Sequence, residues 1–175
     1  MDTKNVDFYE LCLDEGHPFY SEIYSLDKVL FNEWIRENLK EIIKIEKYEE
    51  VVPNNILLDD LMHLGYQHIN YQCHYSAKAI TILNENLKYF TGFVERNSYP
   101  HPIITHSFNI MDEKVIDFAR INNPEYPYIE EDCGLPHIYY GMEIPREFVL
   151  YYQNETMQEN SMKPLLYEWY LENNK

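Results

Sequence analysis

The sequence predicts an α+β protein in which a core helix packs on an antiparallel sheet and acidic helices flank this core. Apolar residues recur at helical spacing over residues 27–50 and again over 73–87. Between residues 89 and 118 the pattern changes to short, nearly alternating runs separated by turn residues, which is typical of antiparallel strands. The 175 residues are 45% hydrophobic and 15% aromatic, which is enough apolar material for a globular core.

The chain length predicts one domain over residues 1–175. Within it we expect three parts, which are an N-terminal helical part, a core that holds the sheet, and C-terminal helices, over residues 1–64, 65–145 and 146–175.

The N-terminal part is predicted to contain two helices. Asp27 can cap the first, which should run to about Glu50, because leucine and isoleucine recur at helical spacing between Leu30 and Ile43. A second, shorter helix is expected over residues 56–64, since Gly65 follows this apolar segment and can end it.

The core helix is predicted to begin near Cys73. Ala77, Ile80, Leu83 and Leu87 fall on one side of a helix with 3.6 residues per turn. The polar, irregular segment before this helix places Cys73 in its first turn.

The remaining elements alternate with clear turn signals. Turns are expected at 97–100 and 111–114, and a proline-containing loop at 121–136. Strands are expected over 89–95, 103–110, from 115 to 118, and over 138–144; helices then follow from Pro145 and over 163–172.

The charge of the chain excludes one class of partner. Fourteen Lys and Arg against thirty Asp and Glu give a formal net charge of −16. Binding to nucleic acid or to an anionic membrane surface requires clustered cations, and the sequence has no basic cluster. The middle of the chain is nearly neutral between two acidic flanks, which indicates solvated helices around a buried centre or an acidic face for a basic protein partner.

The cysteines and the first residues indicate a reducing environment. Three cysteines cannot all pair within one chain, and no CxxC pair is present. The first seven residues carry no basic-then-apolar signal sequence, and no run approaches the roughly 18 apolar residues of a membrane span. We therefore expect a cytoplasmic protein with reduced thiols, in which Cys12 and Cys133 are structural.

Cys73, His106 and Asp117 form a candidate catalytic triad. A helix N-terminus favours a thiolate, a histidine can act as base and acid, and a carboxylate can fix the tautomer of the histidine. The eleven residues between His106 and Asp117 suit a hairpin with a turn at 111–114, which would place both side chains on neighbouring strands.

The order of these residues resembles that of the transglutaminase-like and papain-like cysteine hydrolases. The resemblance covers residues 65–118 and rests on Cys73-His74-Tyr75-Ser76-Ala77, then His106-Ser107-Phe108-Asn109, then Val115-Ile116-Asp117. It implies a helix that begins at the cysteine and packs on an antiparallel sheet carrying the other two residues. The chain differs from the family in having His74, where an aromatic residue usually follows the nucleophile, and Phe118 in place of the usual proline.

The resemblance also implies a glutamine that donates to the oxyanion. Gln67 stands six residues before the cysteine, and Gln72 is the alternative. We further expect His74, Asn109 and Tyr140 to line a substrate pocket.

Each of these residues also has a purely structural interpretation. Cys73 could be a buried helix residue, His106 a core histidine and Asp117 the end of a strand. His74 could be either a solvent-facing residue or a second base, and Asn109 competes with Asp117 as the residue that orients His106.

A zinc site is an alternative, because six potential ligands fall within 44 residues: His63, His68, Cys73, His74, His101 and His106. No pair has the i,i+4 histidine spacing with an intervening Glu that is typical of zinc proteases. We therefore expect neither a metal nor another cofactor.

Two functional hypotheses follow. The first is a cysteine hydrolase or acyltransferase that acts on an amide bond of a protein, a peptide or a small molecule, as a protease, a glutamine amidohydrolase (deamidase) or a transglutaminase, through a thioester intermediate. The second is a non-enzymatic acidic interaction or inhibitor protein, encoded by a phage or mobile element, that keeps this fold as a scaffold.

Overall fold

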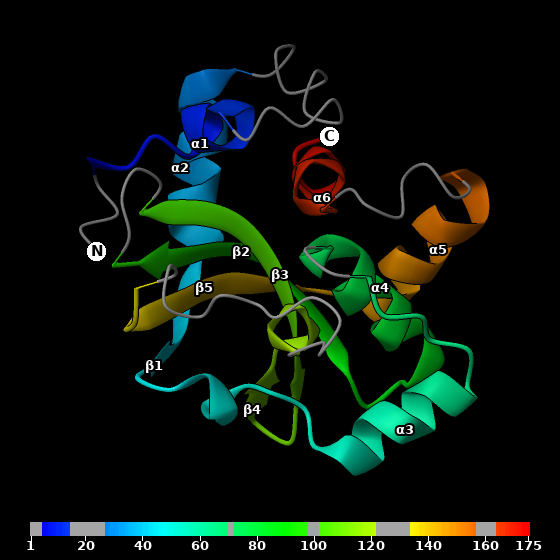
Figure 1. Cartoon of the computed structure of the whole chain (residues 1–175). Coiled ribbons are helices and arrows are strands. Elements are labelled where there is room, and N and C mark those ends of the chain that lie inside the picture. Colours follow the sequence, from blue (N-terminus) through cyan, green and yellow to red (C-terminus); the bar gives the residue numbers. More distant parts are fainter. Residues whose placement is uncertain (1–4, 15–26, 70–71, 98–101, 122–133, 157–163) are drawn as a thin grey trace.

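The computed structural model shows an α+β protein built on a curled, five-stranded antiparallel sheet (Figure 1). It describes residues 5–14, 27–69, 72–97, 102–121, 134–156 and 164–175.

The strands are arranged in the order β1-β5-β2-β3-β4, and every neighbouring pair is antiparallel. Their bounds are β1 (Lys40–Ile45), β2 (Lys88–Arg96), β3 (Ile103–Met111), β4 (Lys114–Ile116) and β5 (His137–Ile144). The C-terminal strand β5 therefore lies between two strands that precede it in the sequence.

Six helices and two short 3₁₀ turns are found in the described residues: α1 (Phe8–Asp14), α2 (Lys28–Asn38), α3 (Asn55–His63), α4 (Cys73–Leu83), α5 (Arg146–Thr156), α6 (Leu166–Asn173), η3 (Tyr48–Glu50) and η4 (Phe118–Arg120). Helices α1, α2 and α6 lie together at one end of the sheet, and α4 and α5 lie side by side at the other (Figure 1). None of these helices is long and apolar enough to cross a bilayer.

The two faces of the sheet are covered differently. On β3, side chains alternate so that Thr105, Ser107 and Asn109 point to one face and His106 and Phe108 to the other. The first face contacts α4 through Asn109, and we call it the helix-covered face. The second, which we call the opposite face, carries an apolar cluster with buried residues from β1, η3 and each of the other strands: Ile45, Tyr48, Val51, Val94, Phe108, Val115 and Tyr139.

The helix-covered face holds two further clusters. Residues of α1, α2 and α6 pack over β2 and β5 around Phe31 and Phe93, and residues of α4, α5 and α6 pack around Tyr89. Helix α4 is thereby fixed between the sheet and α3, whose Leu61 packs against Ile80 of α4.

The predicted long helix over residues 27–50 is wrong in its second half. Asp27 does cap a helix, since its carboxylate accepts from the backbone N–H groups of Val29 and Leu30. The helix ends at Asn38, however, and residues 40–45 form the edge strand β1. The first part of the chain is therefore not wholly helical. Three isoleucines within four positions favour an extended chain, because β-branched side chains are restricted in a helix.

The core helix and its strands lie where the pattern predicted them. Helix α4 begins at Cys73 and ends four residues before the expected Leu87. The tight turn between β3 and β4 has positive φ angles at Asp112 (50°) and Glu113 (63°), as a two-residue hairpin of type I′ requires.

Two facing glycines mark a close approach of β2 to β5. Gly92 of β2 is paired with Gly141 of β5 on one side and with His106 of β3 on the other. A Cβ on Gly92 would lie 2.3 Å from the carbonyl oxygen of Tyr140, so no other residue fits there without moving the backbone.

Candidate active site

Cys73 lies at the N-terminus of α4, beside the edge of β3. Strand β4 pairs only with residues 109–111 of β3, so among the described strands none covers the β3 edge at His106. The residue before the helix, Gln72, makes no side-chain cap, so no side chain there competes for the N–H groups of the first turn. Cys73 as a whole residue is half-buried.

Two histidines contact this thiol. His106 and His74 both hydrogen-bond to the Cys73 side chain. Burial raises the pKa of the thiol, but its electrostatic interactions and hydrogen bonds with His74 and His106 outweigh this and hold the pKa well below its ordinary value. These surroundings favour a thiolate at neutral pH.

His106 is bound on its other side by Asp117. Its Nε2 lies 2.7 Å from Oδ2 of Asp117, and both side chains are almost completely buried. Because Nε2 is occupied by the carboxylate, Nδ1 is the ring nitrogen left for the thiol. Burial lowers the pKa of His106. The charges of Asp117 and Cys73 raise it by more than burial lowers it, so the net pKa is about 9.

Asp117 is held in place by three more groups. Its Oδ1 accepts from the backbone N–H of Ala119, and its Oδ2 accepts from the hydroxyl of Tyr139 at 2.8 Å. Arg120 lies one turn further along the chain, with Nε 3.3 Å from the same Oδ2. Burial raises the pKa of this carboxyl, but His106, Arg120 and Tyr139 together lower it far below its usual range, so Asp117 is ionised.

Arg120 belongs to a buried group that extends away from the carboxylate. Its guanidinium lies over the ring of Tyr48, with 5.5 Å between its Cζ atom and the ring centroid, and Nη2 is 3.4 Å from Nδ1 of His137. His137 is fully buried and packs edge-on against Tyr48. These contacts hold the Arg120 guanidinium in position beside the carboxylate of Asp117.

His74 reaches the helix-covered face of the sheet. It is 9% exposed, so it is not a solvent-facing helix residue. Its Nδ1 lies 2.7 Å from Oγ of Ser107, and its Nε2 lies 3.4 Å from Oγ1 of Thr105. Since residues 106 and 107 point to opposite faces, the thiol of Cys73 is flanked by one imidazole from each face of β3.

The other expected site residues do not join this cluster. Gln67 is exposed on the segment before α4, and its role at an oxyanion stays a prediction. Asn109 is fully buried and donates to the backbone oxygen of Ala77 and to the Thr81 hydroxyl, so it joins β3 to α4 and is not a pocket residue.

Tyr140 also lies elsewhere. Its hydroxyl donates to Glu95 of β2, on the helix-covered face, whereas its neighbour Tyr139 points to the opposite face and reaches Asp117. The role of Tyr140 in a substrate pocket stays a prediction, and it is the neighbouring residue, on the other face of the strand, that contacts the triad.

Cys12 is fully buried in the cluster of α1, α2 and α6, in agreement with a structural role, whereas Cys133 lies outside the described residues. His101 of the zinc hypothesis lies outside them as well. In the part of the chain that is described, no group of three or more His, Cys, Asp or Glu side chains is arranged to hold a metal ion.

Three residues of the site were missed from the sequence, namely Tyr139, Arg120 and Ser107. Arg120 had a local signal, because it stands three residues after Asp117 and can reach it across one turn. Tyr139 had none, since its contact with Asp117 depends on the pairing of β5 with β2.

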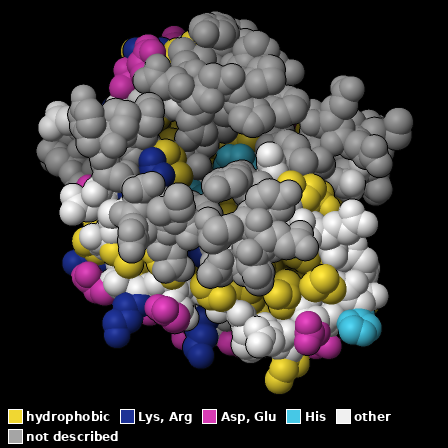
Figure 2. Space-filling view, viewed as in Figure 1, with side chains coloured by type: hydrophobic (Ala, Val, Ile, Leu, Met, Phe, Trp, Pro, Cys, Tyr) yellow, Lys and Arg dark blue, Asp and Glu magenta, His cyan; other side chains and the backbone are white. Residues whose placement is uncertain are grey.

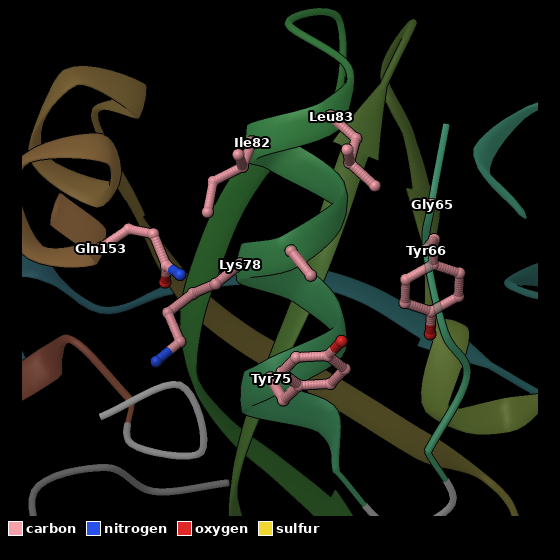
Figure 3. A pocket seen from close by; sticks show the side chains of 8 residues that line it. Gly65, Tyr66, Tyr75, Lys78, Ile82, Leu83 and Gln153 are labelled. Atoms are coloured by element: carbon pink, nitrogen blue, oxygen red, sulfur yellow. The ribbon is translucent and has the colours of Figure 1, made fainter. Parts of the chain in front are cut away.

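A shallow pocket of about 200 Å³ lies on the outer side of α4 (Figure 3). Tyr75, Lys78 and Ile82 line it from α4, Tyr66 from the preceding segment and Gln153 from α5. Cys73, His106 and Asp117 do not line it.

In the space-filling view a histidine side chain and hydrophobic side chains are visible in a recess near the middle of the molecule (Figure 2).

Comparison of the chain with protein-family models, with curated proteins and with solved structures finds no match.

Proposed function

We propose that this protein is a cysteine hydrolase or acyltransferase that acts on an amide bond, with Cys73 as nucleophile, His106 as acid and base, and Asp117 as the residue that orients His106. The observation that carries this proposal is the 2.7 Å contact from Nε2 of His106 to the buried Asp117, with the thiol of Cys73 hydrogen-bonded to the same imidazole. A thiolate beside an imidazolium at a helix N-terminus is an activated nucleophile.

The reaction proceeds in two steps. The Cys73 thiolate attacks the carbonyl carbon of the amide, the C–N bond breaks, and the Nδ1 proton of His106 goes to the leaving nitrogen. The product of this step is a thioester on Cys73 and a free amine or ammonia. Water then attacks the thioester, an imidazole takes its proton, and the thiolate leaves as the acid is released; an amine in place of water would give transamidation.

Donors for the tetrahedral oxyanion would come from the start of α4. The backbone N–H of Cys73 lies in the first turn of the helix, where N–H groups have no partner within the helix. We assign the side-chain donor to Gln67, with Gln72, directly before the helix, as the alternative.

The proposed family is that of the transglutaminase-like and papain-like hydrolases. Support comes from a helix that begins at the cysteine and contacts an antiparallel sheet carrying the histidine, with the acid just after the next strand. Acidic flanking helices are also part of this proposal.

An activated ester tests the nucleophile without knowledge of the natural substrate. The wild-type protein, Cys73→Ala and Cys133→Ser are mixed with p-nitrophenyl acetate and examined by intact-mass spectrometry. The wild type and Cys133→Ser should each gain one acetyl group on Cys73 and release p-nitrophenolate in repeated turnovers. Acetylation of Cys73→Ala at the wild-type rate would exclude Cys73 as the nucleophile.

A peptide panel then separates the amide reactions. Glutamine-containing peptides are incubated with the protein, with and without a primary amine, and their masses distinguish cleavage, deamidation and transamidation. A protein that neither acetylates on Cys73 nor changes any peptide would fit the acidic interaction protein instead.

A further inference from the structure

The second histidine at the thiol has a polar environment that fixes one of its two nitrogens. Nδ1 of His74 is 2.7 Å from the hydroxyl of Ser107, which is 1% exposed. This hydroxyl donates its one proton to Thr91 at 3.0 Å, and it also contacts the hydroxyl of Tyr89 at 3.1 Å. Since the proton of Ser107 is used on Thr91, Ser107 can only accept from His74. Nδ1 of His74 must therefore carry a proton.

Tyr89 keeps this arrangement in place. It is fully buried, and its hydroxyl accepts from the backbone N–H of Leu165 at 3.4 Å, which leaves its own proton to be donated to Ser107. Burial raises the pKa of Tyr89 to about 12, so the phenol stays protonated over the working range of pH. Leu165 thus donates to Tyr89, and Tyr89 in turn donates to Ser107.

Nε2 is therefore the nitrogen of His74 that is left to act as an acceptor. Its neighbour is the hydroxyl of Thr105 at 3.4 Å, and a hydroxyl can donate to a bare ring nitrogen or accept from a protonated one. The ring also hydrogen-bonds to the side chain of Cys73, which places His74 beside the reacting sulfur.

We propose that His74 is a second catalytic residue, which acts as the general base for the water that hydrolyses the thioester on Cys73. This inference rests on the proposed function. In this step the water oxygen bonds to the thioester carbon, the proton of water goes to Nε2 of His74, and the C–S bond breaks as the Cys73 thiolate leaves. The proton then returns to His106 through the sulfur that both rings contact, which restores the starting state.

This assignment divides the reaction between the two histidines. His106 gives its proton to the leaving nitrogen during acylation, and it is held on the opposite face of the sheet by Asp117. His74 serves deacylation from the helix-covered face. An activated ester needs no proton for its leaving group, and His106 still lowers the pKa of the thiol when His74 is absent, so the loss of His74 should act mainly on the second step with such a substrate.

The test is His74→Asn, followed by rapid mixing with p-nitrophenyl acetate. The asparagine amide can replace Nδ1 as the donor to Ser107, but it has no group in the place of Nε2 that can take a proton. The burst of p-nitrophenolate should keep a rate within about threefold of the wild type, while the steady-state rate should fall about 100-fold, the usual effect of removing a general base. Acetyl-Cys73 should then accumulate in the intact-mass spectrum.

Three controls keep the outcome unambiguous. His63→Asn changes an exposed histidine of α3 and should behave as wild type in both phases. Imidazole added to the buffer should speed deacylation of His74→Asn more than that of wild type, which a merely structural role would not produce. His74→Gln, compared by its melting temperature and its burst, replaces His74→Asn if the latter does not fold.

Two results would overturn the assignment. Deacylation of the variant at the wild-type rate would show that His74 is not the base. A folded variant in which the burst rate and the steady-state rate fall by the same factor would show the same. If the wild type forms no acetyl-Cys73, or if Cys73→Ala gives the same burst, the proposed function itself fails and this inference fails with it.

Discussion

At Cys73, the protonation of a single sulfur atom depends on two neighbouring imidazoles and on a buried carboxylate that it does not touch. Against the effect of burial, Asp117 and Cys73 raise the pKa of His106 to about 9, and the imidazolium in turn lowers the pKa of the thiol. The thiolate therefore forms at pH values well below the ordinary thiol pKa of about 8.5. Activity with an amide substrate should fall as the pH rises through about 9, because His106 then loses the proton that the leaving nitrogen needs.

His106→Gln should separate these effects. Its loss removes one of the two histidines that lower the thiol pKa, so the midpoint of thiolate formation should move up toward about 8.5. The measurement is the ultraviolet absorbance of the thiolate against pH, with Cys73→Ala as the blank. An unchanged midpoint would mean that His106 does not pair with the thiol.

Two adjacent tyrosines provide a matched pair of variants. Tyr139→Phe removes the 2.8 Å hydrogen bond to the ionised Asp117, whereas Tyr140→Phe removes a contact with Glu95 on the other face. We expect Tyr139→Phe to lower the free energy of unfolding by about 1.5–3 kcal/mol, the range for hydrogen bonds to charged groups, and to lower turnover. Tyr140→Phe should leave turnover near that of wild type.

Denaturant unfolding and turnover of p-nitrophenyl acetate measure the two quantities for both variants. Equal effects of the two substitutions would show that the Tyr139 hydroxyl does not hold Asp117.

At the scale of the element, the position of His106 depends on how closely β2 approaches its neighbours. Gly92 is paired with His106, and a Cβ there would lie 2.3 Å from Tyr140 O and 2.8 Å from Gly141 Cα. Both are backbone atoms, so Gly92→Ala can be accommodated only if β2 and β5 move apart. We expect a loss of about 3 kcal/mol, the upper end of the range of about 1–3 kcal/mol for overpacking a core, because the overlap is with backbone atoms.

Thermal and denaturant unfolding would measure this loss, and Glu143→Ala, on the exposed side of β5, is the control. A Gly92→Ala protein as stable as the control would contradict the close approach of the two strands.

The sequence was informative for elements formed by neighbouring residues. The hairpin from β3 to β4 and the start of α4 at Cys73 follow from local periodicity and turn residues, and they suffice to bring His106 near Asp117. The edge strand β1 was mistaken for the end of a helix, because its partner β5 lies almost one hundred residues further along the chain. Long-range pairing of this kind leaves no periodic signal in the strand itself.

The same reason explains which site residues could not be predicted. Tyr139 reaches Asp117 only because β5 lies between β1 and β2, so its role depends on the order of the strands. His74 could be read either way, as a surface residue or a second base, until Ser107 and Thr105 were placed beside it.

At the scale of the whole molecule, the formal net charge of −16 produces self-repulsion that opposes the compact state. Added salt screens this repulsion, with a Debye length that falls from about 30 Å at 0.01 M to about 10 Å at 0.1 M. The melting temperature at pH 7 should therefore rise by a few degrees over this range of NaCl. Scanning calorimetry measures it, and a fall would mean that attractive surface pairs outweigh the net charge.

The most direct test of the whole account compares the reactivity of the three thiols. The folded protein is treated with a limiting amount of iodoacetamide near pH 7, and the alkylated cysteines are quantified by peptide mass spectrometry over time. We predict that Cys73 reacts at least ten times faster than Cys12 or Cys133, and that its rate falls several-fold in His106→Gln. Equal, slow alkylation of all three in the wild type would contradict the claim that Cys73 is an activated nucleophile.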